Sequence, residues 1–164
     1  MAYSDVVQFG VSKDLVRRLG YKTMCEVGKD MVLVQRPQPG NEIPQIVRNR
    51  DPGVLINGLR DINVVGIIFD REELTKKVVE KAGELKKTIF IPVGELTLVN
   101  VAERGPKVGR MRKIIFSAHK LGARVQLVTL ASSEIELLST GQLKAVGRFL
   151  LKDKEGGNLF GKIL

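Results

Sequence analysis

Short stretches that are apolar at nearly every position are the feature that most constrains the fold of this chain. Residues 64–69 (VVGIIF), 88–93 (TIFIPV) and 124–130 (RVQLVTL) are runs of this kind, and segments with helical periodicity separate them. A strand that is apolar at successive positions is typical of a parallel sheet whose two faces are both covered by helices. The sequence therefore predicts an α/β fold built from strand–helix units.

Helix-capping residues, and the glycines and prolines that interrupt helices, indicate further elements. Ser12 and Gly20 bracket a short helix, Asp70 and Glu73 resemble a capping box, and Ser139 begins the last helix. A loop carrying Arg104, Gly105 and Pro106 is expected to precede a helix over residues 108–121, and a short helix is expected over residues 42–50. The predicted strands are seven: residues 5–9, 23–27, 31–35, 54–56, 64–69, 88–93 and 124–130.

Seven parallel strands interleaved with helices are compatible with two architectures. One is a small or incomplete α/β barrel of the TIM type, and the other is an open doubly wound sheet. Periodicity does not distinguish them. A chain of 164 residues is the length of one ordinary domain. We expect residues 1–151 to form one barrel-like domain, and residues 152–164, which mix charge and glycine, to form a C-terminal tail.

Histidine and cysteine are too scarce for most metal sites. The chain has one histidine, His119, and one cysteine, Cys25, whereas catalytic zinc or iron sites usually need two or three such ligands. We interpret His119 as a polar residue at a helix flank and Cys25 as a small core residue. Ser132 and Ser133 follow a strand without a histidine base nearby, so we interpret them as a turn or helix cap. We expect no catalytic residue, no metal and no other cofactor.

Positive charge is concentrated in one segment. The chain carries 27 Lys and Arg against 18 Asp and Glu, a net charge of +9, and residues 101–124 hold seven of these cations against the single acid Glu103. A solvated helix face usually mixes charges of both signs, so the missing acids favour phosphate contacts over simple solvation. A second, thinner group of arginines, with Glu42 and Asp51 beside it, comprises Arg36, Arg48, Arg50 and Arg60.

The helix predicted in this segment can be amphipathic. Its apolar residues fall on one face at spacings of three and four, and a cationic stripe falls beside them. The inward residues are Met111, Ile114, Ala118 and Leu121, and the neighbouring stripe is Arg110, Lys113, Ser117 and Lys120. The nucleic-acid-binding residues that we predict are Arg48, Arg50, Arg104, Lys107, Arg110, Arg112, Lys113, Lys120 and Arg124.

The order of these elements resembles a known family. The stretches TIFIPVGELTLVN, RGPKVGRMRKIIFSAHKLGARVQLVTLASS and GQLKAVGRFL, together with YSDVVQF near the start, are similar to protein component 3 of archaeal and eukaryotic ribonuclease P, a PHP-like barrel subunit. The resemblance implies a TIM-like barrel without its relatives' metal site. It also implies a noncatalytic subunit that binds ribonuclease P RNA with a second small protein subunit and supports 5′-leader removal from precursor tRNA, contacting that tRNA indirectly.

Two other functions remain open at this point. One is a divergent metal-dependent phosphoesterase of the PHP type, and the other is a general RNA-binding module. No apolar run approaches the length of roughly 18 residues that a membrane span needs, and the first residues lack the basic start of a secretory signal. We therefore expect no membrane association and a cytoplasmic location.

Overall fold

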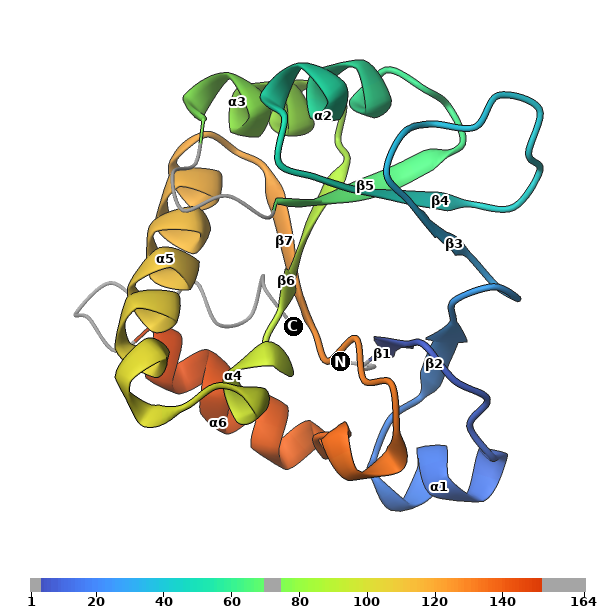
Figure 1. Ribbon diagram of the computed structural model, residues 1–164, viewed down its shortest axis with the longest axis vertical. Helices are drawn as coiled ribbons and strands as arrows, with labels where there is room; N and C mark the ends of the chain where they lie inside the picture. The colour runs from blue at the N-terminus through green and yellow to red at the C-terminus, as the bar shows by residue number, and fades with distance from the viewer. Residues whose placement is uncertain (1–3, 70–74, 152–164) are drawn as a thin grey trace.

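The chain forms a ring of parallel strands with helices on its outside (Figure 1). The structure, a computed structural model, describes residues 4–69 and 75–151. In these residues the strands are β1 (Ser4–Val7), β2 (Thr23–Glu26), β3 (Val32–Val34), β4 (Gln45–Asn49), β5 (Val64–Phe69), β6 (Thr88–Pro92) and β7 (Arg124–Val128). The helices are α1 (Lys13–Arg18), α2 (Pro52–Leu59), α3 (Lys76–Glu84), α4 (Glu95–Leu98), α5 (Val101–Lys120) and α6 (Thr140–Leu150), with a 3-10 turn, η1 (Glu134–Glu136).

The strands lie in sequence order, which decides between the two predicted architectures. β1 pairs with β2, and β3 to β7 form a five-stranded sheet in which every neighbouring pair is parallel. The two sheets adjoin at both edges: the Leu130 amide donates to the Val6 carbonyl at 3.0 Å, and Val27 bridges to Met31. An open doubly wound sheet would place its first strand inside the order. The fold is therefore an incomplete barrel, with seven strands in the described residues where a complete TIM barrel has eight.

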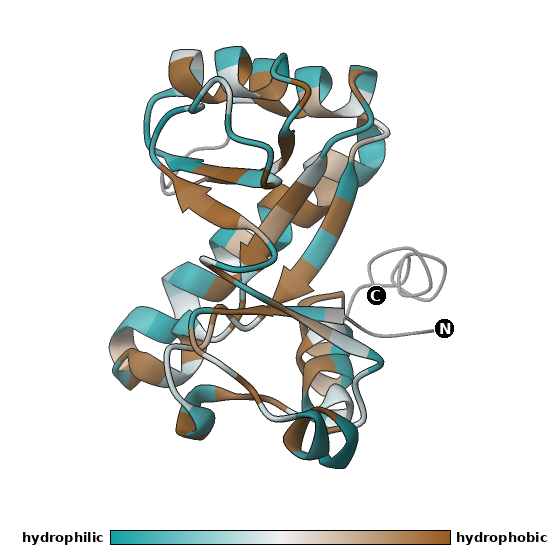
Figure 2. Ribbon diagram, turned by 90° about the vertical axis from the view of Figure 1, so that its right-hand side faces the viewer, coloured by the Kyte–Doolittle hydropathy of each residue, from teal (hydrophilic) through white to brown (hydrophobic). Residues whose placement is uncertain are grey.

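Alternate residues of the strands face two different cores. Val6, Ile46, Ile68, Phe90, Val128 and Leu130 pack together inside the ring. Their neighbours along the strands, such as Val47 and Ile67, pack outward against the helices. Figure 2 shows the apolar strands at the centre, in brown, with polar residues mainly on the outer helices and loops. Burial of both strand faces confirms what the continuous apolar runs predicted, but helices cover only the outer face, because the inner face packs on the other strands of the ring.

Two predicted elements between residues 42 and 59 are wrong. Residues 45–49 form the strand β4 rather than a helix, because Ile46 and Val47 fill the two cores on opposite faces. The predicted strand at 54–56 lies inside α2. Asp51 caps that helix by accepting the Gly53 amide at 2.7 Å, and Pro52 occupies its first turn, which is a helix-start signal.

The remaining predicted elements agree with the structure except at two helix starts. The Ser139 capping box begins α6, and Ser12 caps α1 by accepting the Leu15 amide. Helix α3 begins at Lys76 in the described residues, and the proposed Asp70–Glu73 capping box lies outside them. Helix α5 begins at Val101 rather than at the predicted residue 108. The predicted tail, residues 152–164, also lies outside the described residues.

Candidate nucleic-acid interface

Helix α5 carries most of the predicted cations and begins seven residues earlier than predicted, at Val101. Asn100 caps it by accepting the Glu103 amide at 3.0 Å, and its own side-chain amide donates to Glu103 Oε1 at 3.1 Å. This reciprocal cap resembles a capping box, a sequence signal that outweighs the glycine–proline pair that follows. Pro106 lies within the helix rather than in a loop.

The predicted inward face of α5 is confirmed within the helix, and the predicted cationic stripe is confirmed in part, because Arg110 and Ser117 are half-buried. Met111, Ile114 and Ala118 are buried against the strands, whereas Lys113 and Lys120 are exposed. A helix of 20 residues is roughly 30 Å long, and α5 leads from the carboxyl end of β6 to the amino end of β7. The cations of α5 are therefore spread between two ends of the barrel rather than gathered at one.

A cavity of about 230 Å³ lies at the carboxyl ends of β4, β5 and β6, beside α5. β5 and β6 pair only at Gly66–Thr88 and Ile67–Ile89, although both strands continue further. Beyond these pairs the cavity is lined by Phe69 from β5 and by Phe90, Ile91 and Pro92 from β6. In parallel α/β barrels the carboxyl ends of the strands are the usual position of ligand sites.

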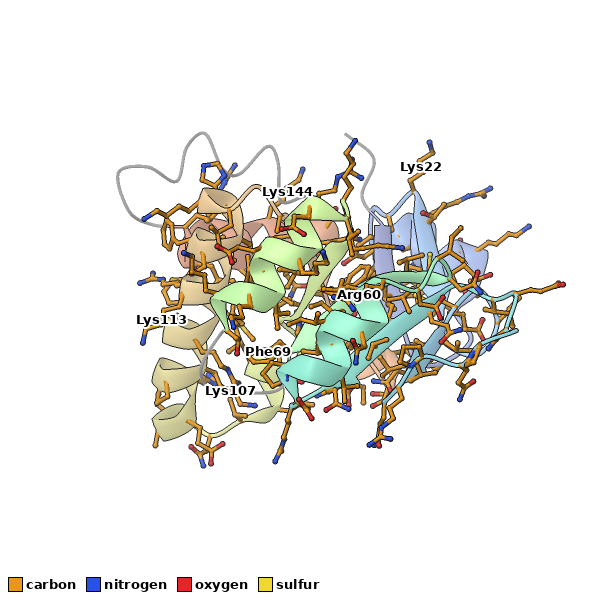
Figure 3. The ribbon with its side chains drawn as sticks, turned by 90° about the horizontal axis from the view of Figure 1, so that it is seen from above. Lys22, Arg60, Phe69, Lys107, Lys113 and Lys144 are labelled. Atoms are coloured by element: carbon orange, nitrogen blue, oxygen red, sulfur yellow. The ribbon has the colours of Figure 1, made fainter. Side chains whose placement is uncertain are left out.

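Four of the predicted cations meet at this cavity. They come from the end of β4 and from the inner edge of α5, and they are Arg48, Arg50, Lys107 and Arg110. Of the acids in the described residues, one carboxylate, Glu95 at the start of α4, lies among them. Figure 3 shows Lys107 close to Phe69, while Lys113 points away from the strands on the outer side of α5.

Glu95 links two of these cations. Its Oε1 lies 2.9 Å from Arg48 Nη2, and its Oε2 lies 3.6 Å from Lys107 Nζ. The three side chains are a quarter to a third exposed, at 28% for Glu95, 32% for Arg48 and 25% for Lys107. Glu95 thus positions two cations at the mouth of the cavity. This residue was not predicted from the sequence, although its place directly after a barrel strand is a signal for a site residue.

Arg112 and Arg104 have backbone contacts of their own. Arg112 Nη2 donates to the Phe149 carbonyl at 2.7 Å, and its guanidinium lies 5.3 Å from the centre of the Phe149 ring. This contact joins α5 to α6. Arg104, in the first turns of α5, is exposed and donates from Nε to the Val99 carbonyl at 3.3 Å.

Lys120 and Arg124 lie at the opposite end of the barrel from the cavity. Lys120 is the last residue of α5 and Arg124 the first residue of β7, and both are exposed. The segment that looked like one cationic site in sequence therefore contributes to both ends of the barrel. The fold brings Arg48, Arg50, Lys107 and Arg110 together at the cavity. Arg104, Lys113 and Lys120 are instead exposed along the outer side of α5.

The other residues that the sequence singled out have ordinary environments. Cys25 is half-buried, and burial followed by the nearby Asp30 and Asp5 carboxylates raises the pKa of its thiol. His119 is exposed. Ser132 Oγ donates to Glu136 at 2.8 Å in the turn around η1.

Within residues 4–69 and 75–151, no three His, Cys, Asp or Glu side chains are grouped so that they could hold a metal ion. None of the helices that the structure describes is both long enough and apolar enough to cross a membrane.

Comparisons with known proteins show what the fold is similar to. No protein-family model and no curated protein sequence matches this chain. Among solved structures, the fold is similar to a chain in a cryo-EM structure of archaeal ribonuclease P with mature tRNA, with a TM-score of 0.69 and 11% sequence identity. The match covers 98% of this chain and 78% of that chain. At this identity the likeness shows a shared fold.

Proposed function

We propose that this chain is a protein subunit of ribonuclease P, of the PHP-like barrel type known as protein component 3. It binds the catalytic RNA and supports 5′-leader removal from precursor tRNA, while the RNA performs the cleavage. The shared fold with a chain of archaeal ribonuclease P over 98% of this sequence supports the assignment. A second small ribonuclease P protein is its expected partner, precursor tRNA is contacted indirectly, and its expected location is the cytoplasm.

The observation that carries RNA binding is the arrangement of cations along α5. Arg104, Lys113 and Lys120 are exposed on this helix, and Lys107 and Arg110 join Arg48 and Arg50 at the cavity. The helix carries one acid, Glu103, and its carboxylate accepts from the Asn100 cap. Cations placed in this way release counterions when they reach an RNA backbone, which favours binding. Arg112 is assigned a structural role between α5 and α6.

The function is tested by reconstituting precursor-tRNA cleavage across a magnesium series. The reactions contain ribonuclease P RNA alone or with the second protein subunit, each with and without this chain. Protein cations replace part of the screening that Mg²⁺ provides to packed phosphates. We therefore expect this chain to accelerate cleavage at low Mg²⁺ when the partner is present, and the acceleration to shrink as Mg²⁺ rises.

Equal cleavage rates with and without this chain at low Mg²⁺, with the partner present, would reject the ribonuclease P assignment. Binding of unrelated structured RNAs with the same affinity would then identify the chain as a general RNA-binding module. A heat-denatured sample of the same protein serves as the control for nonspecific effects of added polycation.

A further inference from the structure

We propose that the cavity at the carboxyl ends of β4, β5 and β6 is a binding site for a terminal phosphate monoester. The proposed site takes one phosphate group and does not depend on the chain being a ribonuclease P subunit. The site is distinct from the exposed cations on the outer side of α5.

The excess of positive charge around the cavity favours binding of an anion. Among the residues that the structure describes, four cationic side chains, Arg48, Arg50, Lys107 and Arg110, line it together with one carboxylate. Glu95 contacts Arg48 and Lys107, so its single negative charge is shared between two cations. Arg50 and Arg110 have no ion-pair partner among the described residues. Like charges that converge on a cavity repel one another, and an anion placed between them relieves that repulsion.

Arginine supplies the geometry that phosphate needs. A planar guanidinium can donate two parallel hydrogen bonds to two oxygens of one phosphate group, which a lysine ammonium does not do. Arg50 and Arg110 reach the cavity from the end of β4 and from α5, two elements that are far apart in sequence. Arg50 is exposed and Arg110 is half-buried, so both guanidinium groups are accessible to a ligand in the cavity.

The size and lining of the cavity favour a phosphate at the end of a molecule. Its volume of about 230 Å³ is below the roughly 300 Å³ at which pockets for drug-sized ligands begin. Its inner side is apolar, with Ile89, Met111 and Ile114 among the lining residues. A bridging phosphodiester carries about one negative charge. A terminal monoester carries about −1.5 to −2 at pH 7, so it gains more from the cations at the cavity.

The cavity lies where the backbone pairing between β5 and β6 ends. An added Cβ at Gly66 would lie 2.2 Å from the Thr88 carbonyl oxygen and 2.5 Å from the Phe90 ring, so β5 and β6 approach here more closely than a side chain would allow. Just beyond this close contact their pairing ends, and the cavity lies between their carboxyl ends. The site is thus built from regular strands and a long helix.

Binding is measured by isothermal titration calorimetry on the full chain in the absence of any ribonuclease P RNA. The probes are inorganic phosphate, adenosine 5′-monophosphate and adenosine. We expect phosphate and the monophosphate to bind and adenosine not to bind. The double variant Arg50→Gln and Arg110→Gln should weaken binding of both anions by at least about tenfold, because it removes two charge-assisted hydrogen-bond donors.

A matched control removes the same charge elsewhere. Lys13→Gln and Arg17→Gln change two cations on α1, away from the cavity, and should leave phosphate affinity unchanged. Circular dichroism and thermal unfolding of both variants establish that they fold. An equal decrease of affinity in the two variants would show only nonspecific attraction by net charge and would overturn the proposal, as would binding of adenosine as tight as that of its monophosphate.

A final pair of probes distinguishes the source of the phosphate. Oligoribonucleotides of one sequence are compared with a 5′-phosphate and with a 5′-hydroxyl. A preference for the 5′-phosphate that disappears in the Arg50→Gln and Arg110→Gln variant identifies the end of an RNA strand as the ligand. Equal binding of the two oligonucleotides, with phosphate and the monophosphate still bound, identifies a small phosphorylated molecule. Failure of all the phosphate-bearing probes to bind would overturn the proposal and leave the ribonuclease P assignment untouched.

Discussion

Asp5 is the buried carboxylate on which the closure between β1 and the segment after β7 depends. Its side chain is fully buried and accepts hydrogen bonds from the Thr129 amide at 2.7 Å, the Thr129 hydroxyl at 2.6 Å and the Val6 amide at 2.8 Å. Removing the carboxyl group would leave these donors buried without an acceptor, which costs about 1–3 kcal/mol for each group. The residue therefore contributes to the ring of strands rather than to the cationic site.

Burial gives Asp5 a testable pH signature. Desolvation raises the pKa of its carboxyl above the usual 3.8, against the opposing effect of the hydrogen bonds from Thr129 and Val6. The folded state therefore keeps a proton that the unfolded state has released, and stability falls as pH rises from about 4 through the raised pKa. Asp5→Asn lacks this titration. Its free energy of unfolding relative to the natural chain should increase across this window, by up to about 1.4 kcal/mol per pH unit.

Urea unfolding of both proteins between about pH 4 and pH 7 measures this difference. Parallel stability curves for the natural chain and Asp5→Asn would contradict the prediction, because they would place the folded pKa at its unfolded value. Asp5→Ala is the companion variant. It should be less stable than Asp5→Asn at every pH in the window, since alanine has no acceptor for Thr129.

At the scale of elements, α5 is both a core helix and a cationic surface. Replacing Arg104, Lys113 and Lys120 by Ala should weaken binding to ribonuclease P RNA and flatten its salt dependence, while the buried residues Met111 and Ile114 keep the helix in place. Each RNA phosphate that the variant no longer neutralises should reduce the slope of log K against log salt by about 0.7 to 0.9. Filter binding or fluorescence anisotropy between low and moderate salt measures the slope.

The control for α5 removes the same amount of charge on another side of the barrel. Lys13, Arg17 and Lys22 are cations on α1 and just before β2, and their replacement by Ala should change the slope much less. An unchanged slope in the α5 variant would mean that its outer cations are only solvated. The result would remove the main support for RNA binding by this helix.

At the scale of the whole molecule, the barrel has an architecture that many enzymes share. The chain holds one histidine and one cysteine, and the described residues contain no group of three potential ligands. We expect the isolated protein to show no hydrolysis of a phosphodiester with Mn²⁺ or Zn²⁺, because such catalysis needs a metal held with an open position. Robust hydrolysis that persists through repurification, and is lost on mutating one carboxylate, would instead identify a divergent phosphoesterase.

Local signals determined most of the elements of this fold. Val64–Phe69 is a strand whose apolar run packs into a core on each of its two faces. Ser139 and Gln142 begin α6 through a capping box, which needs no tertiary partner. The same kind of signal, Asn100 with Glu103 and Asp51 with Pro52, also marks α5 and α2, so these two helix starts could have been predicted.

The candidate site could not be obtained in this way. Residues 101–124 form one cationic block along the chain, but a helix of this length carries Lys107 to one end of the barrel and Lys120 to the other. Arg50 joins Arg110 because β4 ends beside α5, and Glu95 holds Arg48 and Lys107 across three elements. Caps and periodicity act over a few residues, so the sequence by itself determined the elements. The closing of strands in order around a common core decided which charges meet.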